Sequence, residues 1–70
     1  MDKVQLGNVL RERRIFLKLT QQDLAEMART TPRTIYQVEN GEGNPSLDTL
    51  TNITDVLGVE LNIELKRPRL

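Results

Sequence analysis

Residues 19–41 read LTQQDLAEMARTTPRTIYQVENG, and this stretch decides the fold because it contains two helix starts. At the first start, Thr20 precedes a short segment of helical periodicity and Asp23 follows three residues later. This spacing is a variant of the capping box, in which a hydroxyl and a carboxylate satisfy free amides at the positive end of a helix. We therefore predict a short helix over residues 21–28.

The second helix start follows after a break of three residues, 29–31. Thr31 can cap a helix, and Pro32 fits the first helical position because its missing amide hydrogen would have no partner there. Gly41 can supply the left-handed conformation that ends many helices. The predicted helix begins at Pro32 and ends at about Asn40.

Apolar residues at helical spacing predict one further helix on each side of this pair. Before it, a helix is expected over residues 6–19, with the apolar positions Leu6, Val9, Leu10 and Leu17. After it, Ser46 is the expected cap of a helix that Gly58 ends, with the apolar positions Leu47, Leu50, Ile53, Val56 and Leu57. Residues 1–58 are thus predicted to form an all-α domain of about four helices.

After Gly58 the apolar period changes to two, with apolar residues at Val59, Leu61, Ile63 and Leu65. This alternation predicts a half-buried β-strand over residues 59–66, followed by a short tail, 67–70, that contains Pro68. One strand in a helical domain has no partner of its own, and an exposed apolar edge pairs readily with another chain. We therefore predict that the strand, through these four residues, pairs antiparallel across a homodimer.

The composition limits the chemistry that is available to this chain. A chain of 70 residues buries a small core, and such chains commonly gain stability from a partner subunit. It contains no Cys and no His, which argues against disulfides, thiolate or imidazole metal sites and Ser/His or Cys/His catalysis. We expect no enzyme activity, no metal and no cofactor, and we expect Phe16 to serve packing in the core or in a dimer.

The location of the protein is predicted from its apolar runs. None approaches the roughly 20 residues of a membrane span, and the first residues lack the apolar core of a signal peptide. We therefore expect a cytoplasmic protein that has no membrane partner.

The charges sum to zero, but they are unevenly distributed along the chain. Residues 1–38 hold seven basic and four acidic residues, residues 39–63 hold five acidic and no basic residues, and residues 64–70 hold three basic and one acidic. This pattern fits a basic surface that faces DNA, and it fits ordinary solvated faces equally well.

Four sequence blocks at fixed mutual spacing resemble the Xre/Cro/CI family of helix-turn-helix proteins. They are LTQQDLAE at 19–26, TI at 34–35, ENG at 39–41 and NPSLDTL at 44–50, and the resemblance covers residues 6–58. It implies that the helix beginning at Pro32 enters the major groove of double-stranded DNA. The base-contacting positions that it implies are Pro32, Arg33, Thr34, Tyr36 and Gln37, and the phosphate-contacting positions that it implies are Gln21 and Asn40. Lys18, Thr20 and Arg29 are further candidates for phosphate contacts. The resemblance also implies a structural ion pair between Arg14 and Glu39.

The side chains at these positions suit the recognition of bases. Arg33 can donate two hydrogen bonds to guanine, and Gln37 can form the equivalent pair with adenine. Tyr36 is suited to a thymine methyl group or a phosphate, and equally to simple packing with an exposed hydroxyl. Pro32 has no amide hydrogen to donate, so a contact through shape is expected there.

Two departures from the family pattern accompany the resemblance. The turn carries Arg29 and Thr30 where the family commonly has Gly and an apolar residue, which predicts a looser or differently shaped turn. The predicted C-terminal strand is similar to that of HipB-type antitoxins, which implies a HipA-like kinase toxin as a further partner.

Two functional hypotheses follow. The first is a repressor that binds an inverted-repeat operator as a homodimer, with an antitoxin that regulates its own operon as a special case. The alternative is a protein-interaction module that no longer binds DNA specifically.

Overall fold

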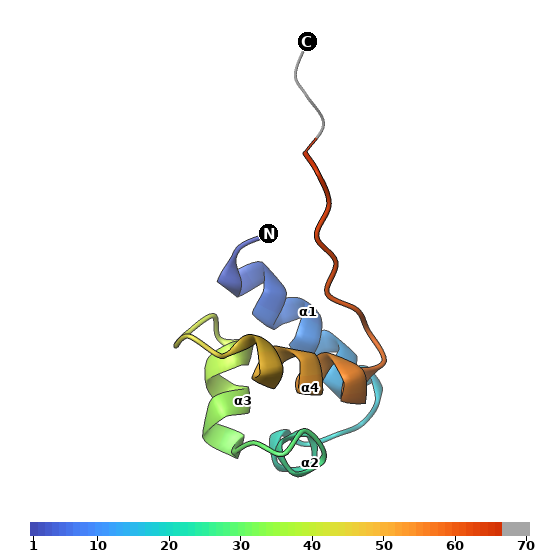
Figure 1. Ribbon diagram of the computed structural model, residues 1–70. Helices are drawn as coiled ribbons and strands as arrows, with labels where there is room; N and C mark the ends of the chain where they lie inside the picture. Colours follow the sequence, from blue (N-terminus) through green and yellow to red (C-terminus); the bar gives the residue numbers. More distant parts are fainter. Residues whose placement is uncertain (67–70) are drawn as a thin grey trace.

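The computed structural model describes residues 1–66. All regular secondary structure in this range is helical, in the order α1 (Lys3–Phe16), α2 (Gln21–Met27), α3 (Pro32–Glu39) and α4 (Leu47–Leu57). Figure 1 shows the helices gathered in one body, with an extended segment that leaves α4, passes α1 and projects away from the helices. No helix of the described range has the length and apolar character to cross a bilayer.

Helix α1 begins and ends three residues earlier than predicted, at Lys3 and Phe16. Its start is fixed by Asp2, whose carboxylate accepts a hydrogen bond from the Gln5 amide (2.8 Å), while the Gln5 side chain accepts one from the Asp2 amide (3.0 Å). This reciprocal pair is a capping box, so the sequence did contain the signal for the true start. The end is set by the left-handed backbone at Lys18 (φ 59°).

Helices α2 and α3 begin where the sequence predicts. Thr20 Oγ1 accepts from the Asp23 amide, and Asp23 Oδ2 accepts from the Thr20 amide, both at 2.9 Å. Thr31 Oγ1 accepts from the Thr34 amide at 3.2 Å, with Pro32 at the first helical position. Each of these bonds joins residues three apart, which explains why the sequence alone could locate both starts.

The turn between α2 and α3 is not loosened by its missing glycine. Arg29 itself adopts the left-handed conformation, with φ 59°. The Thr30 amide then donates to the Ala25 carbonyl at 2.9 Å, which closes the end of α2. The expectation of a looser or differently shaped turn is therefore wrong, because the arginine adopts the backbone conformation that a glycine would otherwise supply.

Eight apolar side chains form the core, and every helix contributes to it: Leu10, Leu24, Ala25, Ala28, Ile35, Val38, Ile53 and Leu57. At Gly7 the backbone of α1 lies so close to α3 that a Cβ atom would collide with the carbonyl oxygens of Val38 and Glu39. Phe16 lies outside this core with 72% of its surface exposed, so the core location considered for it is wrong. The Arg13 guanidinium lies 5.2 Å from the centre of its ring.

Residues 59–66 form no strand, and the predicted C-terminal β-strand is wrong. The segment is extended, but a strand needs hydrogen bonds from a neighbouring strand, and residues 1–66 supply none. Val59 is half-buried against the core, whereas Ile63 and Leu65 are fully exposed. The predicted tail, 67–70, lies outside the described residues.

Candidate nucleic-acid interface

The outer surface of the α2–α3 unit holds most of the residues singled out from the sequence. Helix α3 directs Ile35, Val38 and Glu39 inward, and all three are buried. Its opposite side faces solvent, so residues three and four apart share one free surface. This surface is short enough, at eight residues, to present a single compact set of side chains.

The five predicted base-contacting residues lie on α3, but their exposure differs. Pro32, Arg33 and Tyr36 are exposed, with 52% of the Tyr36 surface accessible. Thr34 is half-buried, and its hydroxyl lies 3.0 Å from that of Thr31. Gln37 is also half-buried, and its amide lies against Gly43 in the loop that follows α3.

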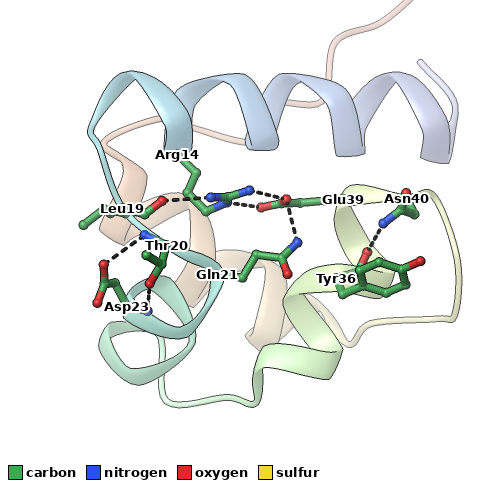
Figure 2. A network of polar contacts seen from close by, with 8 residues as sticks. All are labelled: Arg14, Leu19, Thr20, Gln21, Asp23, Tyr36, Glu39 and Asn40. Atoms are coloured by element: carbon green, nitrogen blue, oxygen red, sulfur yellow. Dashed lines mark hydrogen bonds and ion pairs between the residues drawn. The ribbon is translucent and has the colours of Figure 1, made fainter.

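An ion pair with its hydrogen bonds fixes α3 against α1 (Figure 2). Arg14 Nε donates to Glu39 Oε2 at 2.6 Å and Arg14 Nη2 donates to Glu39 Oε1 at 2.9 Å, which makes the pair bidentate. Both side chains are largely buried, with 12% and 2% of their surfaces exposed. The hydrogen bonds to Glu39 raise the pKa of Arg14 above its ordinary value, so the guanidinium stays charged.

The same network includes the start of α2. Arg14 Nη1 donates to the Leu19 carbonyl at 2.8 Å, and Gln21 Nε2 donates to Glu39 Oε1 at 3.2 Å (Figure 2). These contacts hold the first turn of α2 beside the last turn of α3. The angle between the two helices is thereby set by side chains that come from both of them and from α1.

The predicted phosphate-contacting residues fall in two places. Lys18, Thr20 and Gln21 lie at or just before the start of α2, and Gln21 contacts Glu39, the residue before Asn40 at the end of α3. The Asn40 side chain donates to the Tyr36 carbonyl at 2.7 Å. Arg29 lies at the other end of α2 and lines a surface groove with Asn52, Asp55 and Val56 of α4.

Two basic residues outside the predicted sites, Lys3 and Arg13, make long-range contacts. Lys3 Nζ donates to the Gly43 carbonyl (2.6 Å) and to Asn44 Oδ1 (2.7 Å), and so ties the start of α1 to the loop after α3. Arg13 Nε donates to the Leu57 carbonyl at 2.8 Å, where it satisfies a free acceptor at the end of α4. These contacts join residues 40 and 44 positions apart, and no local pattern indicates them.

The predicted dimer-contacting residues lie along the extended segment. Val59 is half-buried, Leu61 is 43% exposed, and Ile63 and Leu65 extend into solvent.

Among residues 1–66, no group of three or more acidic side chains is arranged to hold a metal ion. The arrangement is that of a binding surface, with polar and basic groups on α3 and at the start of α2.

The chain matches a helix-turn-helix family model and a protein that is named as a regulator. The family model that matches is described as helix-turn-helix and covers residues 10–63. A protein of Methanococcus maripaludis named as a candidate HTH-type transcriptional regulatory protein is 44% identical over 55 residues. That alignment covers 79% of this chain and 17% of the relative, so the chain spans less than a fifth of its length.

Two solved structures with regulatory names have a similar fold. The clp gene regulator ClgR from Corynebacterium glutamicum superposes with a TM-score of 0.78 at 29% identity, covering 84% of this chain and 76% of that one. The restriction-modification controller protein C.AhdI from Aeromonas hydrophila superposes with a TM-score of 0.77 at 32% identity. In that case 81% of this chain and 86% of the other are covered.

Proposed function

The chain belongs to the Xre-type helix-turn-helix family of transcription regulators, and on this premise we propose that it represses transcription as a sequence-specific, DNA-binding homodimer. The observation that carries the proposal is the exposed side of α3, which presents Arg33 and Tyr36 on a helix fixed by the Arg14–Glu39 pair. An α-helix fits the major groove of B-DNA, and in this motif its first residues read the base edges.

Arg33 is the main base-reading residue of the proposal. It is exposed in the first turn of α3, and a bidentate arginine–guanine contact contributes about 1–3 kcal/mol of discrimination against a wrong base. Gln37 is proposed to read adenine after its amide leaves Gly43, with Tyr36 at a thymine methyl group. Two further residues complete the surface: Thr34 is proposed to contact DNA through its hydroxyl, and Pro32 through its shape.

The phosphate contacts are proposed for Lys18, Thr20 and Gln21 around the start of α2 and for Asn40 at the end of α3. Such contacts fix the register of the protein on DNA without choosing its sequence. Gln21 already donates to Glu39, so its orientation toward a phosphate would be fixed before DNA binds. Arg29 is proposed as a more distant phosphate contact, from the opposite end of α2.

Two copies are needed to read an inverted repeat, because one α3 spans only a few base pairs. In dimers of this motif, the half-sites lie about 34–36 Å apart or at a multiple of that distance. The exposed apolar residues of the extended segment, Leu61, Ile63 and Leu65, together with Val59, support a second copy as the partner. The antitoxin hypothesis depended on a C-terminal strand that residues 59–66 do not form, so we propose no toxin partner.

The proposal is tested by fluorescence anisotropy with DNA from upstream of the protein's own gene, across a series of salt concentrations. We expect tight binding that falls steeply with salt, because basic side chains displace counterions from phosphates. Arg33→Ala is expected to weaken binding to this DNA by roughly 5- to 150-fold, which corresponds to the loss of one bidentate base contact.

The matched control is Arg11→Ala, which removes the same charge from an exposed position on α1. It is expected to change the affinity by less than about twofold, since Arg11 is not among the residues proposed to contact DNA and an isolated exposed charge is screened by salt. Equal and weak binding to the upstream DNA and to scrambled DNA would contradict the proposal. That outcome would favour the protein-interaction module.

A further inference from the structure

An apolar groove of about 240 Å³ runs between α1 and the extended segment, and we call it the α1–tail groove. Leu6, Val9 and Leu10 line it from α1, and Val59 and Leu61 line it from the segment. Glu60 lies at the same groove and places a negative charge beside these apolar walls. None of the residues proposed to contact DNA lines it.

The segment continues beyond the groove as an arm formed by residues 63–66. Its apolar residues Ile63 and Leu65 have 102% and 98% of their surfaces exposed. They are two positions apart in an extended chain, so their side chains point to the same side. Glu64 and Lys66 alternate with them and lie on the other side of the arm, so the arm carries one charge of each sign.

The arm cannot fill the groove of its own chain without a sharp reversal. Residues 59–62 form one wall of the groove, and Ile63 follows that wall directly. Residues 59–66 contain no Gly or Pro, and Asn62, which also favours turns, lies in the extended part that lines the groove. The arm is therefore available to a groove on another molecule.

We infer that two copies of this chain exchange arms, so that Ile63 and Leu65 of one copy fill the α1–tail groove of the other. A two-fold axis makes the exchange reciprocal, since each copy supplies one arm and one groove. The apolar side of each arm then covers the apolar walls of the receiving groove, which removes both surfaces from water. The inference rests on the proposed homodimer and names the surfaces that hold it together.

Sedimentation equilibrium of the purified chain without DNA tests the exchange. Val9→Asp places a charge in the groove beside Glu60, and Ile63→Asp places one on the arm. Each is expected to raise the dimer dissociation constant more than about tenfold, because a carboxylate must lose its hydration on entering an apolar contact. The matched control is Ile15→Asp on the same helix, which lies outside the groove and is exposed to 53%, compared with 46% for Val9. It should leave the dimer unchanged.

Mixing the two variants gives the decisive result. In a mixed dimer, the intact arm of the Val9→Asp chain meets the intact groove of the Ile63→Asp chain, and both substitutions fall in the other arm–groove pair. Neither variant alone retains an intact pair. We therefore expect the mixture to associate more tightly than either variant by itself, with circular dichroism confirming that both are folded. Failure of the mixture to gain affinity, or a dimer that either variant leaves intact, would overturn the exchange. A wild-type chain that stays monomeric would do the same. Because no DNA is present, these results are independent of the proposed operator binding.

Discussion

Two basic residues, Lys18 and Arg29, hold backbone conformations that side chains rarely adopt. Both have φ 59°, one just before the start of α2 and the other just after its end. A non-glycine residue in the left-handed region raises the free energy of the folded state by about 1–2 kcal/mol. The structure tolerates this strain because the flanking helices are fixed by their caps and by the core.

Replacing Arg29 with glycine should relieve part of this strain. We expect Arg29→Gly to raise the free energy of unfolding by roughly 0.5–1 kcal/mol, since glycine's larger loss of backbone entropy offsets some of the gain. Urea denaturation measures the change. Arg33→Gly is the control, because the same replacement inside α3 should instead lower stability by about 1 kcal/mol. A loss of stability in Arg29→Gly would show that contacts of the arginine side chain outweigh the strain.

Because of Asp23, the stability of α2 is expected to fall as the pH becomes acidic. Hydrogen bonds from the backbone amide and the hydroxyl of Thr20 lower the pKa of its carboxyl below the ordinary value. A carboxyl whose pKa is lowered by folding stabilises the protein above its unfolded pKa of about 4, and this contribution disappears as the pH falls through the folded pKa.

We therefore expect Asp23→Ala to be less stable than the wild type at neutral pH and to approach it in stability below about pH 4. Thermal unfolding followed by circular dichroism between neutral and acidic pH measures this convergence. Asp48→Ala, in the first turn of α4, is the control for a general loss of charge near a helix start. A constant difference between wild type and Asp23→Ala at every pH would contradict the prediction.

At the scale of the elements, the relative placement of α1, α2 and α3 depends on one charged network. Glu39 accepts hydrogen bonds from Arg14 and from Gln21, and it is buried at the end of the helix that is proposed to read DNA. A buried ion pair contributes little net stability compared with apolar residues of the same size, but removing one partner leaves a charge without compensation. The network thus determines the helix arrangement more than the overall stability.

Glu39→Ala should lower the free energy of unfolding by about 3–5 kcal/mol, because Arg14 keeps a buried charge. The double variant Arg14→Met with Glu39→Met should recover most of that loss, since two apolar side chains fill the space. Urea denaturation measures both. If the pair also orients α3, the double variant will bind the operator more weakly than the wild type despite its recovered stability. Equal stability of Glu39→Ala and the wild type would contradict the buried charge argument.

At the scale of the whole molecule, a small core and a large exposed apolar surface coexist. Eight buried side chains hold the four helices together, while Ile63, Leu65 and Phe16 remain largely in water. Exposed apolar side chains on a projecting segment favour association with another chain. The helical body is formed within the described chain, whereas the association surface, which uses part of α1, is completed by a partner copy in our inference.

The sequence by itself determined the local features of this protein. The three predicted helix caps at Thr20, Thr31 and Ser46 are confirmed, as are the left-handed backbone of Gly41 after α3 and the end of α4 at Gly58. Each is a hydrogen bond or a backbone preference within a few residues, so neighbouring side chains are enough to specify it. The missed start of α1 at Asp2 belongs to the same class and was available in the sequence.

Only part of the candidate site could be predicted from the sequence. The residues of α3 came from the resemblance and from their side-chain chemistry, and they do lie on one helix. Their exposure depends on neighbours distant in sequence, so the partial burial of Gln37 against Gly43 could not be predicted. Likewise, the groove that Arg29 lines depends on the packing of α4.

Only the tertiary structure decided which long-range contacts form and what the last described residues do. The contacts of Lys3 with the loop after α3 and of Arg13 with the end of α4 join residues 40 and 44 positions apart. The alternating pattern of residues 59–66 indicated an extended chain, but it could not supply a neighbouring strand. A helix satisfies its hydrogen bonds within its own segment, whereas a strand depends on a partner, so the same kind of local evidence determined the helices and not the strand.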